Sequence, residues 1–294
     1  MNPKVSICIP AYRRPASLLR AVESVLAQCY DDYEVIITDD SPDDSVAIAL
    51  GIYKSDDRIK YYKNAVTLGS PGNWNEAINK ASGEYIKILH HDDWFFSENS
   101  LSEFVAMLEN SKSADFAFCS SSACDSEGDF KFIHTPSDYQ LSMLIKFYKN
   151  VFPYNFIGSP SATIFRRNNN KFDQNLKWVV DMDFYMNLLK DNSNFVFNSK
   201  TLVNIDAGEE NKVTTACLAD KNLQIYEWIY LYKKYWPDAK FDLKILWFFC
   251  KLFNKCRVST IDDILRAAVV PPIPIVAKLA LKINRIGTNL RKLK

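Results

Sequence analysis

Features that mark several common protein classes are missing from this chain of 294 residues. Its seven cysteines are odd in number and none forms a Cys-x-x-Cys pair, which argues against a disulfide scaffold or a zinc knuckle and favours a reducing cytoplasm. No window reaches the roughly 18–20 uninterrupted apolar residues that a spanning helix needs. The apolar run near the N-terminus is too short for a signal peptide. We therefore expect a cytoplasmic protein that is not integral to a membrane.

Histidine is also scarce. The chain has three, and two of them, His90 and His91, stand together in the segment "HHDD". Metal-dependent hydrolases usually draw several ligands from histidine, and only His134 remains. A metal-dependent phosphohydrolase is therefore disfavoured. We expect one of the two adjacent histidines to line a site and the other to pack.

The charges are distributed unevenly along the chain. Residues 240–294 contain 12 Lys and Arg against 3 Asp and Glu, whereas the preceding 239 residues contain 24 against 32. There are no internal repeats and no low-complexity linker. We expect a catalytic domain at residues 1–217 and a helical, basic extension at residues 218–294.

Short apolar runs alternate with helical patterns over the first hundred residues. Strands are predicted at residues 5–10, 33–38, 58–64 and 84–89, with helices at 15–28, 43–55 and 73–82 between them. Strands separated by helices predict an α/β protein with a doubly wound, mostly parallel sheet flanked by helices. Further along, the sequence predicts strands at 115–120 and 159–167 and helices at 98–111, 181–191 and 218–236.

Polar clusters follow three of these strands. "PAYRR" comes after the first strand, "DDSPDD" after the second and "HHDDWF" after the fourth. Ligands of open parallel sheets bind beyond the carboxyl ends of the strands. We therefore expect the three clusters to converge on one site.

Two interpretations apply to Asp92 and Asp93. Adjacent carboxylates at a strand end are costly unless they are solvated or paired with a cation, and hard oxygen ligands select Mg²⁺ or Mn²⁺, typically shared with substrate phosphates. The alternative is a helix N-cap, since a helix follows shortly. The second acidic cluster favours the metal site.

The other acidic pairs have simpler explanations when they are taken alone. Asp39 and Asp40 suit a turn and a helix cap, with hydrogen bonds to a nucleobase or ribose as the alternative. Asp181 and Asp183 suit the positive end of a helix dipole, with a general base as the alternative.

Three segments resemble the family 2 glycosyltransferases of the nucleotide-sugar type, which adopt the α/β fold called GT-A. They are "VSICIPAYRRPASLLRAVESVLAQCYDDYEVIITDDSPDD", "GNWNEAINKASGEYIKILHHDDWF" and "VVDMDFYMNLL", between residues 5 and 189. The first two are strongly specific together, and the third is less so.

The resemblance implies a role for each matching position. It implies a catalytic base at Asp181, with Asp183 as its rival, and a divalent cation, Mn²⁺ or Mg²⁺, at Asp93 and Asp92 with His91 as a further ligand. Contacts with the nucleotide or donor are implied for Pro10, Ala11, Tyr12, Arg13, Asp39, Asp40, Asn73, Asn75 and Asp92.

The chain departs from the family pattern at a few positions. His90 stands where the family more often has Asp, and Val180 replaces a common Glu. Arg13 stands where Asn or another polar residue is frequent, and the segment 206–217 has no histidine. The departures at His90 and Val180 keep a second hypothesis open, a catalytically silent relative that binds a nucleotide or a partner protein.

The function that the resemblance implies is inverting transfer of a sugar from a UDP-sugar to a saccharide or lipid-linked saccharide, in bacterial surface-polysaccharide assembly. Residues 240–294 mix large apolar side chains with positive charge, which suits a segment lying on an anionic cytoplasmic membrane surface. The alternative is an apolar face that covers the catalytic domain. No motif accompanies the basic residues that would indicate nucleic-acid binding.

Overall fold

The computed structural model describes residues 2–208, 213–237 and 242–292. The chain forms two compact units. The N-terminal unit consists of residues 1–175 and 180–208, and the C-terminal unit of residues 176–179 and 209–294. These units are defined by packing, and the functional boundary expected at residue 217 stays a prediction.

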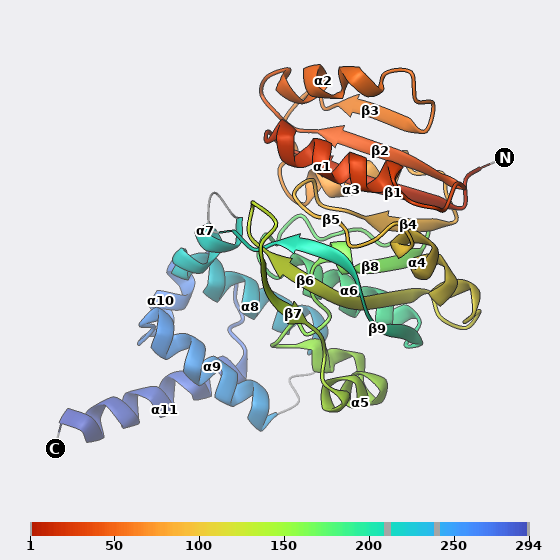
Figure 1. The fold of residues 1–294 in the computed structure, drawn as a ribbon. Coiled ribbons are helices and arrows are strands. Elements are labelled where there is room, and N and C mark those ends of the chain that lie inside the picture. Colours follow the sequence, from red (N-terminus) through yellow and green to blue (C-terminus); the bar gives the residue numbers. More distant parts are fainter. Residues whose placement is uncertain (1, 209–212, 238–241, 293–294) are drawn as a thin grey trace. The chain divides into compact units, whose positions relative to one another are not determined.

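The first half of the N-terminal unit is a parallel sheet with the strand order β3-β2-β1-β4 (Figure 1). Its strands are β1 (Val5–Ala11), β2 (Tyr33–Asp39), β3 (Ile59–Lys63) and β4 (Tyr85–Ile88). In the register of the sheet Ala11 pairs with Asp39, and Asp39 pairs with Lys63. The carboxyl ends of these strands therefore meet at one edge, as the alternating pattern predicted.

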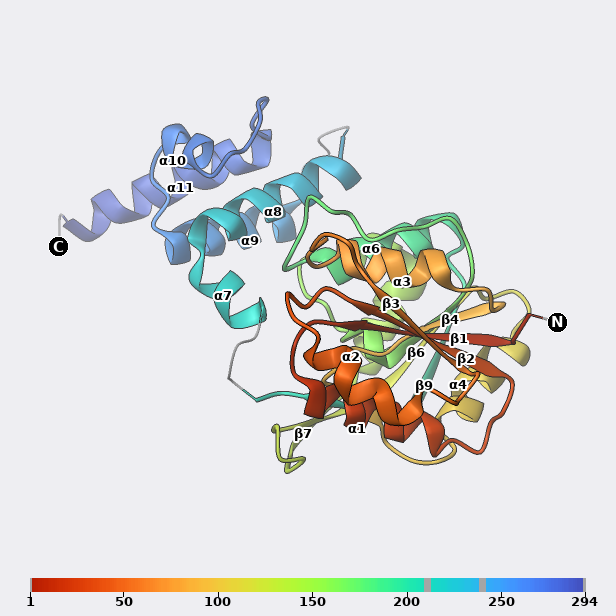
Figure 2. The ribbon, with the colours of Figure 1, turned by 90° about the horizontal axis from the view of Figure 1, so that it is seen from above.

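Helices cover both faces of this sheet. Figure 2 shows α1 (Pro15–Leu26) and α2 (Ser45–Leu50) on one face and α3 (Gly72–Lys80) and α6 (Val180–Asp191) on the other. The apolar face of α1 is buried in the core through Leu18, Val22 and Val25. The α/β prediction is confirmed. The second predicted helix is shorter than expected, because its end forms a 3₁₀ turn at Gly51–Tyr53.

Beyond β4 the sheet becomes mixed, which the prediction of a mostly parallel sheet did not include. β8 (Thr163–Arg166) pairs antiparallel with β4 and with β6 (Phe116–Cys124), and β9 (Phe195–Asp206) pairs parallel with β6. The predicted strand at 159–167 is reduced to four residues, because Pro160 opens a 3₁₀ turn before it.

The sequence did not predict β9 or two shorter strands. β5 (Trp94–Phe95) has only two residues and pairs antiparallel with β9, and β7 (Phe130–His134) pairs antiparallel with β6. No residue of β7 is buried, so this strand has no core face that would mark it in the sequence. The remaining helices of the unit are α4 (Ser100–Glu109) and α5 (Asp138–Lys146).

The described part of the C-terminal unit is helical. Its helices are α7 (Val213–Ala219), α8 (Lys221–Tyr235), α9 (Leu243–Cys256), α10 (Ile261–Arg266) and α11 (Ile275–Lys292). The helix predicted at 218–236 is split, because Asp220 caps the start of α8 by accepting a hydrogen bond from the Leu223 N–H. Phe249 and Phe253 of α9 and Ala277 and Ala280 of α11 are buried. None of the described helices is long and apolar enough to cross a bilayer.

Candidate active site

Asp39 lies at the end of β2 and is fully buried. One carboxylate oxygen accepts hydrogen bonds from the Tyr61 hydroxyl at 2.8 Å and the Lys63 ammonium at 3.0 Å. The other accepts the Ser41 N–H at 2.8 Å. Burial raises the pKa of Tyr61, and the adjacent Asp39 carboxylate raises it further. Asp39 therefore joins the end of β3 to the turn that carries Asp40.

The carboxylate of Asp40 holds the loop at residues 64–69. It accepts hydrogen bonds from the Asn64 side chain at 2.7 Å, the Leu68 N–H at 3.0 Å and the Gly69 N–H at 2.7 Å. A carboxylate has about four sites for donors, so this group is largely satisfied by the protein. A nucleobase at Asp40 would share the carboxylate with these N–H groups.

Two asparagines of α3 also bind backbone groups. The Asn73 amide donates to the carbonyl oxygens of Ala11 at 3.1 Å and Thr38 at 3.0 Å, so it ties the ends of β1 and β2 together. Asn75 donates to the Phe172 carbonyl and accepts the Phe172 N–H, each at 2.8 Å. Both amides thus hold α3 in place beside the strand ends, and their contact with a diphosphate stays a prediction.

The chain turns sharply after β1. Pro10 and Ala11 are buried, whereas the Tyr12 side chain is 45% exposed at the strand end. Arg13 and Arg14 both have positive φ, 55° and 51°, an uncommon conformation for residues with a side chain. The Arg13 N–H donates to the Ser41 hydroxyl at 2.7 Å. This turn presents Tyr12 beside the acidic loop that follows β2.

Three side chains that follow β4 in the chain form a candidate cation site. Ligand atoms of His90, Asp92 and Asp93 all lie within 4.8 Å of one another. The His90 Nδ1 is 3.9 Å from an oxygen of Asp93, whose other oxygen accepts the Asp206 N–H at 3.0 Å. The Arg14 guanidinium lies 3.5 Å from Asp92. The fourth strand therefore delivers two carboxylates and one imidazole to a single point.

The two histidines have different surroundings. The ring of His90 packs against Trp74, with 4.6 Å between centroids, and burial lowers the pKa of His90 to about 4. The His91 Nδ1 lies 3.2 Å from the Pro10 carbonyl oxygen. In the part of the chain that the structure describes, the Nε2 atoms of both histidines are buried without a hydrogen-bond partner. His90 groups with the aspartates, whereas His91 is bound to β1.

This donor set fits a divalent cation. Asp93 is 3% exposed, and burying a carboxylate is costly unless a cation or hydrogen bonds compensate it. Because His90 is neutral at pH 7, its ring nitrogens can act as ligands. Carboxylate oxygens with one imidazole suit Mn²⁺ or Mg²⁺.

The two candidate bases at the start of α6 differ in accessibility. Asp181 is partly exposed, and its carboxylate accepts hydrogen bonds from the Asn155 amide and the Met182 N–H, each at 2.9 Å. Asp183 is 1% exposed. An acceptor hydroxyl can reach only a carboxylate that is open to the site, which favours Asp181.

Sequence patterns did not indicate two residues that support these groups. Asn155 bridges Asp181 to the Gly158 carbonyl, to which it donates at 3.0 Å. Arg20 lies 3.7 Å from the centre of the Trp94 ring and donates to the Asp92 carbonyl at 3.2 Å. Asn155 lies in a loop with no recurring pattern, and Arg20 looks like an ordinary helix surface residue, so neither carries a local signal.

Residues 6–172 match the model of the glycosyl transferase family 2. The chain belongs to this family. It is 38% identical over 97 residues to a beta-1,3-glucosyltransferase of Campylobacter jejuni named for the acceptor GalNAc(5)-diNAcBac-PP-undecaprenol, covering 32% of this chain and 31% of that protein. It is 30% identical over 194 residues to WcaA of Escherichia coli, named as a colanic acid biosynthesis glycosyl transferase, covering 64% and 67%. The match thus spans about a third of the length of the Campylobacter relative.

Solved structures show the same fold at low sequence identity. Staphylococcus aureus TarS 1–349 in complex with UDP-GlcNAc has a TM-score of 0.60 at 15% identity, covering 97% of this chain and 92% of that one. The mannosyltransferase PcManGT of Pyrobaculum calidifontis, in complex with GDP-Man and Mn²⁺, has a TM-score of 0.58 at 12% identity, covering 99% and 81%. The GT-A fold predicted from the sequence is confirmed.

Proposed function

We propose that this family 2 glycosyltransferase moves a sugar from a UDP-sugar to a saccharide or lipid-linked saccharide during surface-polysaccharide synthesis, with inversion at the anomeric carbon. The observation that carries the proposal is the grouping of His90, Asp92 and Asp93 behind β4, at the edge where β1 and β2 also end. The names of the Campylobacter and Escherichia relatives support the polysaccharide setting.

A nucleoside diphosphate suits the edge of the sheet. Tyr12 offers an exposed aromatic ring for a base, and Arg14 places a positive charge next to Asp92. TarS was solved with UDP-GlcNAc and UDP, which supports a UDP-sugar as the donor.

Asp92, Asp93 and His90 would hold Mn²⁺ or Mg²⁺, and His91 stays the further ligand predicted from the family resemblance. When bound, such a cation supplies positive charge that stabilises the departing diphosphate. The protein adds fixed charge of its own through Arg14, 3.5 Å from Asp92.

Asp181 acts as the general base. Its carboxylate takes the proton of the acceptor hydroxyl, whose oxygen attacks the anomeric carbon from the side opposite the diphosphate. Asn155, which donates to Asp181 at 2.9 Å, holds the carboxylate in position. General-base assistance of this kind is typically worth about 10²–10⁴-fold in rate.

The C-terminal unit lies peripherally on the anionic, cytoplasmic face of a membrane. Support comes from the charge balance of residues 240–294 and from exposed apolar side chains of its helices, including Trp247 at 62%, Ile275 at 61% and Ile286 at 61% exposure. Exposed aromatic and aliphatic side chains next to basic ones are typical of interfacial helices. A lipid-linked acceptor would be presented at the same surface.

The test is sugar-nucleotide turnover by the full chain. UDP release is measured from a panel of UDP-sugars, with Mn²⁺ and then with an excess of a chelator. Release that depends on the cation and is stimulated by a polyprenyl-diphosphate-linked saccharide supports the proposal. Nucleotide binding without any turnover would overturn it in favour of the silent relative.

A further inference from the structure

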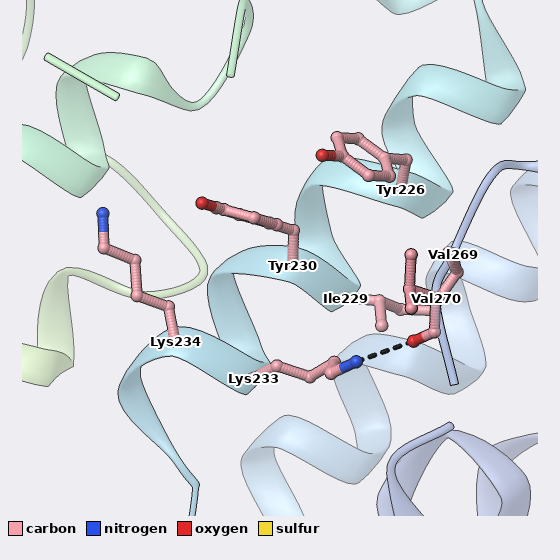
Figure 3. Close-up of a pocket in the computed structure, with 7 residues that line it drawn as sticks. All are labelled: Tyr226, Ile229, Tyr230, Lys233, Lys234, Val269 and Val270. Carbon is pink, nitrogen blue, oxygen red and sulfur yellow. Dashed lines mark hydrogen bonds between the residues drawn. The ribbon is translucent and has the colours of Figure 1, made fainter. Parts of the chain in front are cut away.

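The C-terminal unit contains two cavities with basic side chains. The first, of about 460 Å³, lies against α8 and is lined by Tyr226, Ile229, Tyr230, Lys233, Lys234, Val269 and Val270. Figure 3 shows that the Lys233 ammonium turns to the Val270 carbonyl, to which it donates at 2.7 Å. This cation already has a partner within the protein.

The second cavity, of about 510 Å³, is formed by α10, the turn at 271–273 and α11, and we call it the α10–α11 groove. Three exposed cations of α11 line it, Lys278, Lys282 and Arg285. Their spacing of four and three residues places them on one side of the helix. Among the described residues none of these three side chains has a hydrogen bond or ion pair, and no lining residue is acidic.

The floor of the groove is apolar. Ile273 and Leu281 are buried beneath it, and Ile261 and Leu265 remain 38% and 40% exposed at its side. A small inorganic anion would leave these apolar groups in contact with water. An occupant that carries both a phosphate and a hydrocarbon chain matches the cationic row and the apolar floor together.

A second apolar row runs along α11 beside the cations. Ile275, Ile283 and Ile286 are 61%, 45% and 61% exposed. At 3.6 residues per turn this row lies next to Lys278 and Lys282 and away from the buried face that contains Ala277. If the isoleucines enter a lipid layer, the cations lie at the depth of the headgroups.

We propose that the α10–α11 groove binds the phosphate headgroup of an anionic bilayer phospholipid. Lys278, Lys282 and Arg285 contact the phosphate, and the lipid chain packs along Ile261, Leu265 and Leu281. This inference rests on the proposed membrane association and narrows it to one groove with one class of lipid.

The experiment is flotation of the full chain with two kinds of vesicle, pure phosphatidylcholine and phosphatidylcholine containing phosphatidylglycerol. Wild type should bind the second kind only. Each basic residue near an anionic surface contributes a factor of roughly five, so Lys278→Ala/Lys282→Ala/Arg285→Ala should weaken binding about 100-fold. The control Lys54→Ala/Lys112→Ala/Lys146→Ala removes the same charge from exposed sites of the N-terminal unit and should bind nearly as wild type. Equal weakening by both triple variants would overturn the proposal, because net charge alone would then explain binding.

An apolar variant separates a lipid from other anions. Leu265→Ser should weaken vesicle binding about ten-fold, whereas Ile48→Ser, at a position that is 77% exposed in the N-terminal unit, should not. Vesicle binding that is unchanged in Leu265→Ser would overturn the proposal that a lipid occupies the groove. Vesicle binding that inorganic phosphate or an oligonucleotide abolishes at low concentration would also overturn it and would assign the groove to a free phosphate or a nucleic acid.

The same samples distinguish the two proposals. Thermal unfolding with UDP and Mn²⁺ should give the same ligand-induced shift for wild type and the groove variants. Wild type that shifts with UDP but floats with neither vesicle would overturn the groove while the transferase stands. Flotation without any nucleotide shift would overturn the transferase while the groove stands.

Discussion

Charged side chains are paired at short range in the N-terminal unit and stand apart along α11 in the C-terminal unit. In the first, Lys60 lies 2.6 Å from the buried Glu34, and Lys63 lies 3.0 Å from the buried Asp39. In the second, the exposed Lys278 and Lys282 have no hydrogen bond or ion pair with any residue that the structure describes.

The difference separates two uses of charge. A buried carboxylate with a cation and backbone donors fixes a loop or strand end, as Asp39 and Asp40 do. An exposed cation without a partner contributes little to folding, and it remains available to an external anion. We infer that the N-terminal unit pairs its buried carboxylates to hold its strands and the loops of the site, and that the α10–α11 groove keeps its cations for a lipid.

The largest expected effect concerns the chemistry assigned to the N-terminal unit. Asp181→Asn should lower the rate of sugar transfer by about 10²–10⁴-fold, because the amide cannot take the proton of the acceptor. Nucleotide binding should not change. The measurement is kcat with saturating donor, together with UDP affinity.

Asp183→Asn is the matched comparison for this change. Asp183 is buried, so its substitution should alter stability more than the proton transfer. If Asp181→Asn kept a near-full rate and Asp183→Asn lost it, the general base would be Asp183 and not Asp181.

The next effect concerns Glu227, a buried carboxyl group of the C-terminal unit that, unlike the cations of α11, is hydrogen-bonded within the protein. Glu227 is fully buried, and it accepts the N–H groups of Lys177, Trp178 and Val179 at 2.7, 3.0 and 3.0 Å. Glu227→Ala leaves the buried Val179 N–H and two partly buried N–H groups without their acceptor and should cost about 4 kcal/mol. For a chain near this size that lowers the thermal midpoint by about 10 °C.

Glu98→Ala is the control, since Glu98 is exposed and should leave the midpoint unchanged. An equal midpoint for Glu227→Ala and wild type would contradict a structural role for Glu227. Glu227 holds the backbone at Val179, two residues before the proposed base Asp181. The Glu227 variant should therefore also lower the transfer rate.

The smallest effect is a pH dependence in the N-terminal unit. Burial disfavours the charged form of Glu34, but hydrogen bonds from Lys60, Ser6 and Ser82 outweigh it and lower the pKa of Glu34 from 4.5 to about 2. The folded pKa is the lower one, so this stability is present above pH 4.5 and is lost as the pH falls toward 2. It amounts to about 3 kcal/mol.

Glu34→Gln should therefore be less stable than wild type at pH 7 by about 3 kcal/mol, and the gap should narrow below pH 4.5. Urea unfolding at pH 7, 5 and 3 measures it, with Glu98→Gln as the control. A gap that stays constant with pH would contradict the pairing of Glu34 with Lys60.

The sequence predicts the first half of the fold well because its pattern there is local. β1 to β4 and the helices between them follow apolar periodicity, so their order and the site edge are predictable. The strand β9 is not predictable in this way, because Asn198 and Lys200 interrupt its apolar residues and because its position depends on pairing with β6. Antiparallel insertion of β8 between β4 and β6 likewise has no local signature.

The candidate site divides in the same way. Asp92 and Asp93 were predictable because they belong to the polar cluster that follows a strand, whereas the sequence did not indicate that His90, and not His91, would group with them. Contacts from distant segments were not predictable from the sequence. Examples are the hydrogen bond from the Asp206 N–H to Asp93 and the one from the Asn155 amide to Asp181. These pairs are brought together by the fold, and no spacing along the chain records them.

Nucleotide-dependent thermal unfolding tests the central claim most directly. Wild type, Asp93→Ala and the exposed control Asp31→Ala are heated with UDP, GDP or CDP, with and without Mn²⁺. Ligand at about 100 times Kd adds roughly 2.7 kcal/mol, which is a shift of several degrees for a chain of this size. We expect a shift with UDP that needs Mn²⁺, persists in Asp31→Ala and is lost in Asp93→Ala. No shift with any of the nucleotides, or an equal shift in Asp93→Ala, would contradict the account.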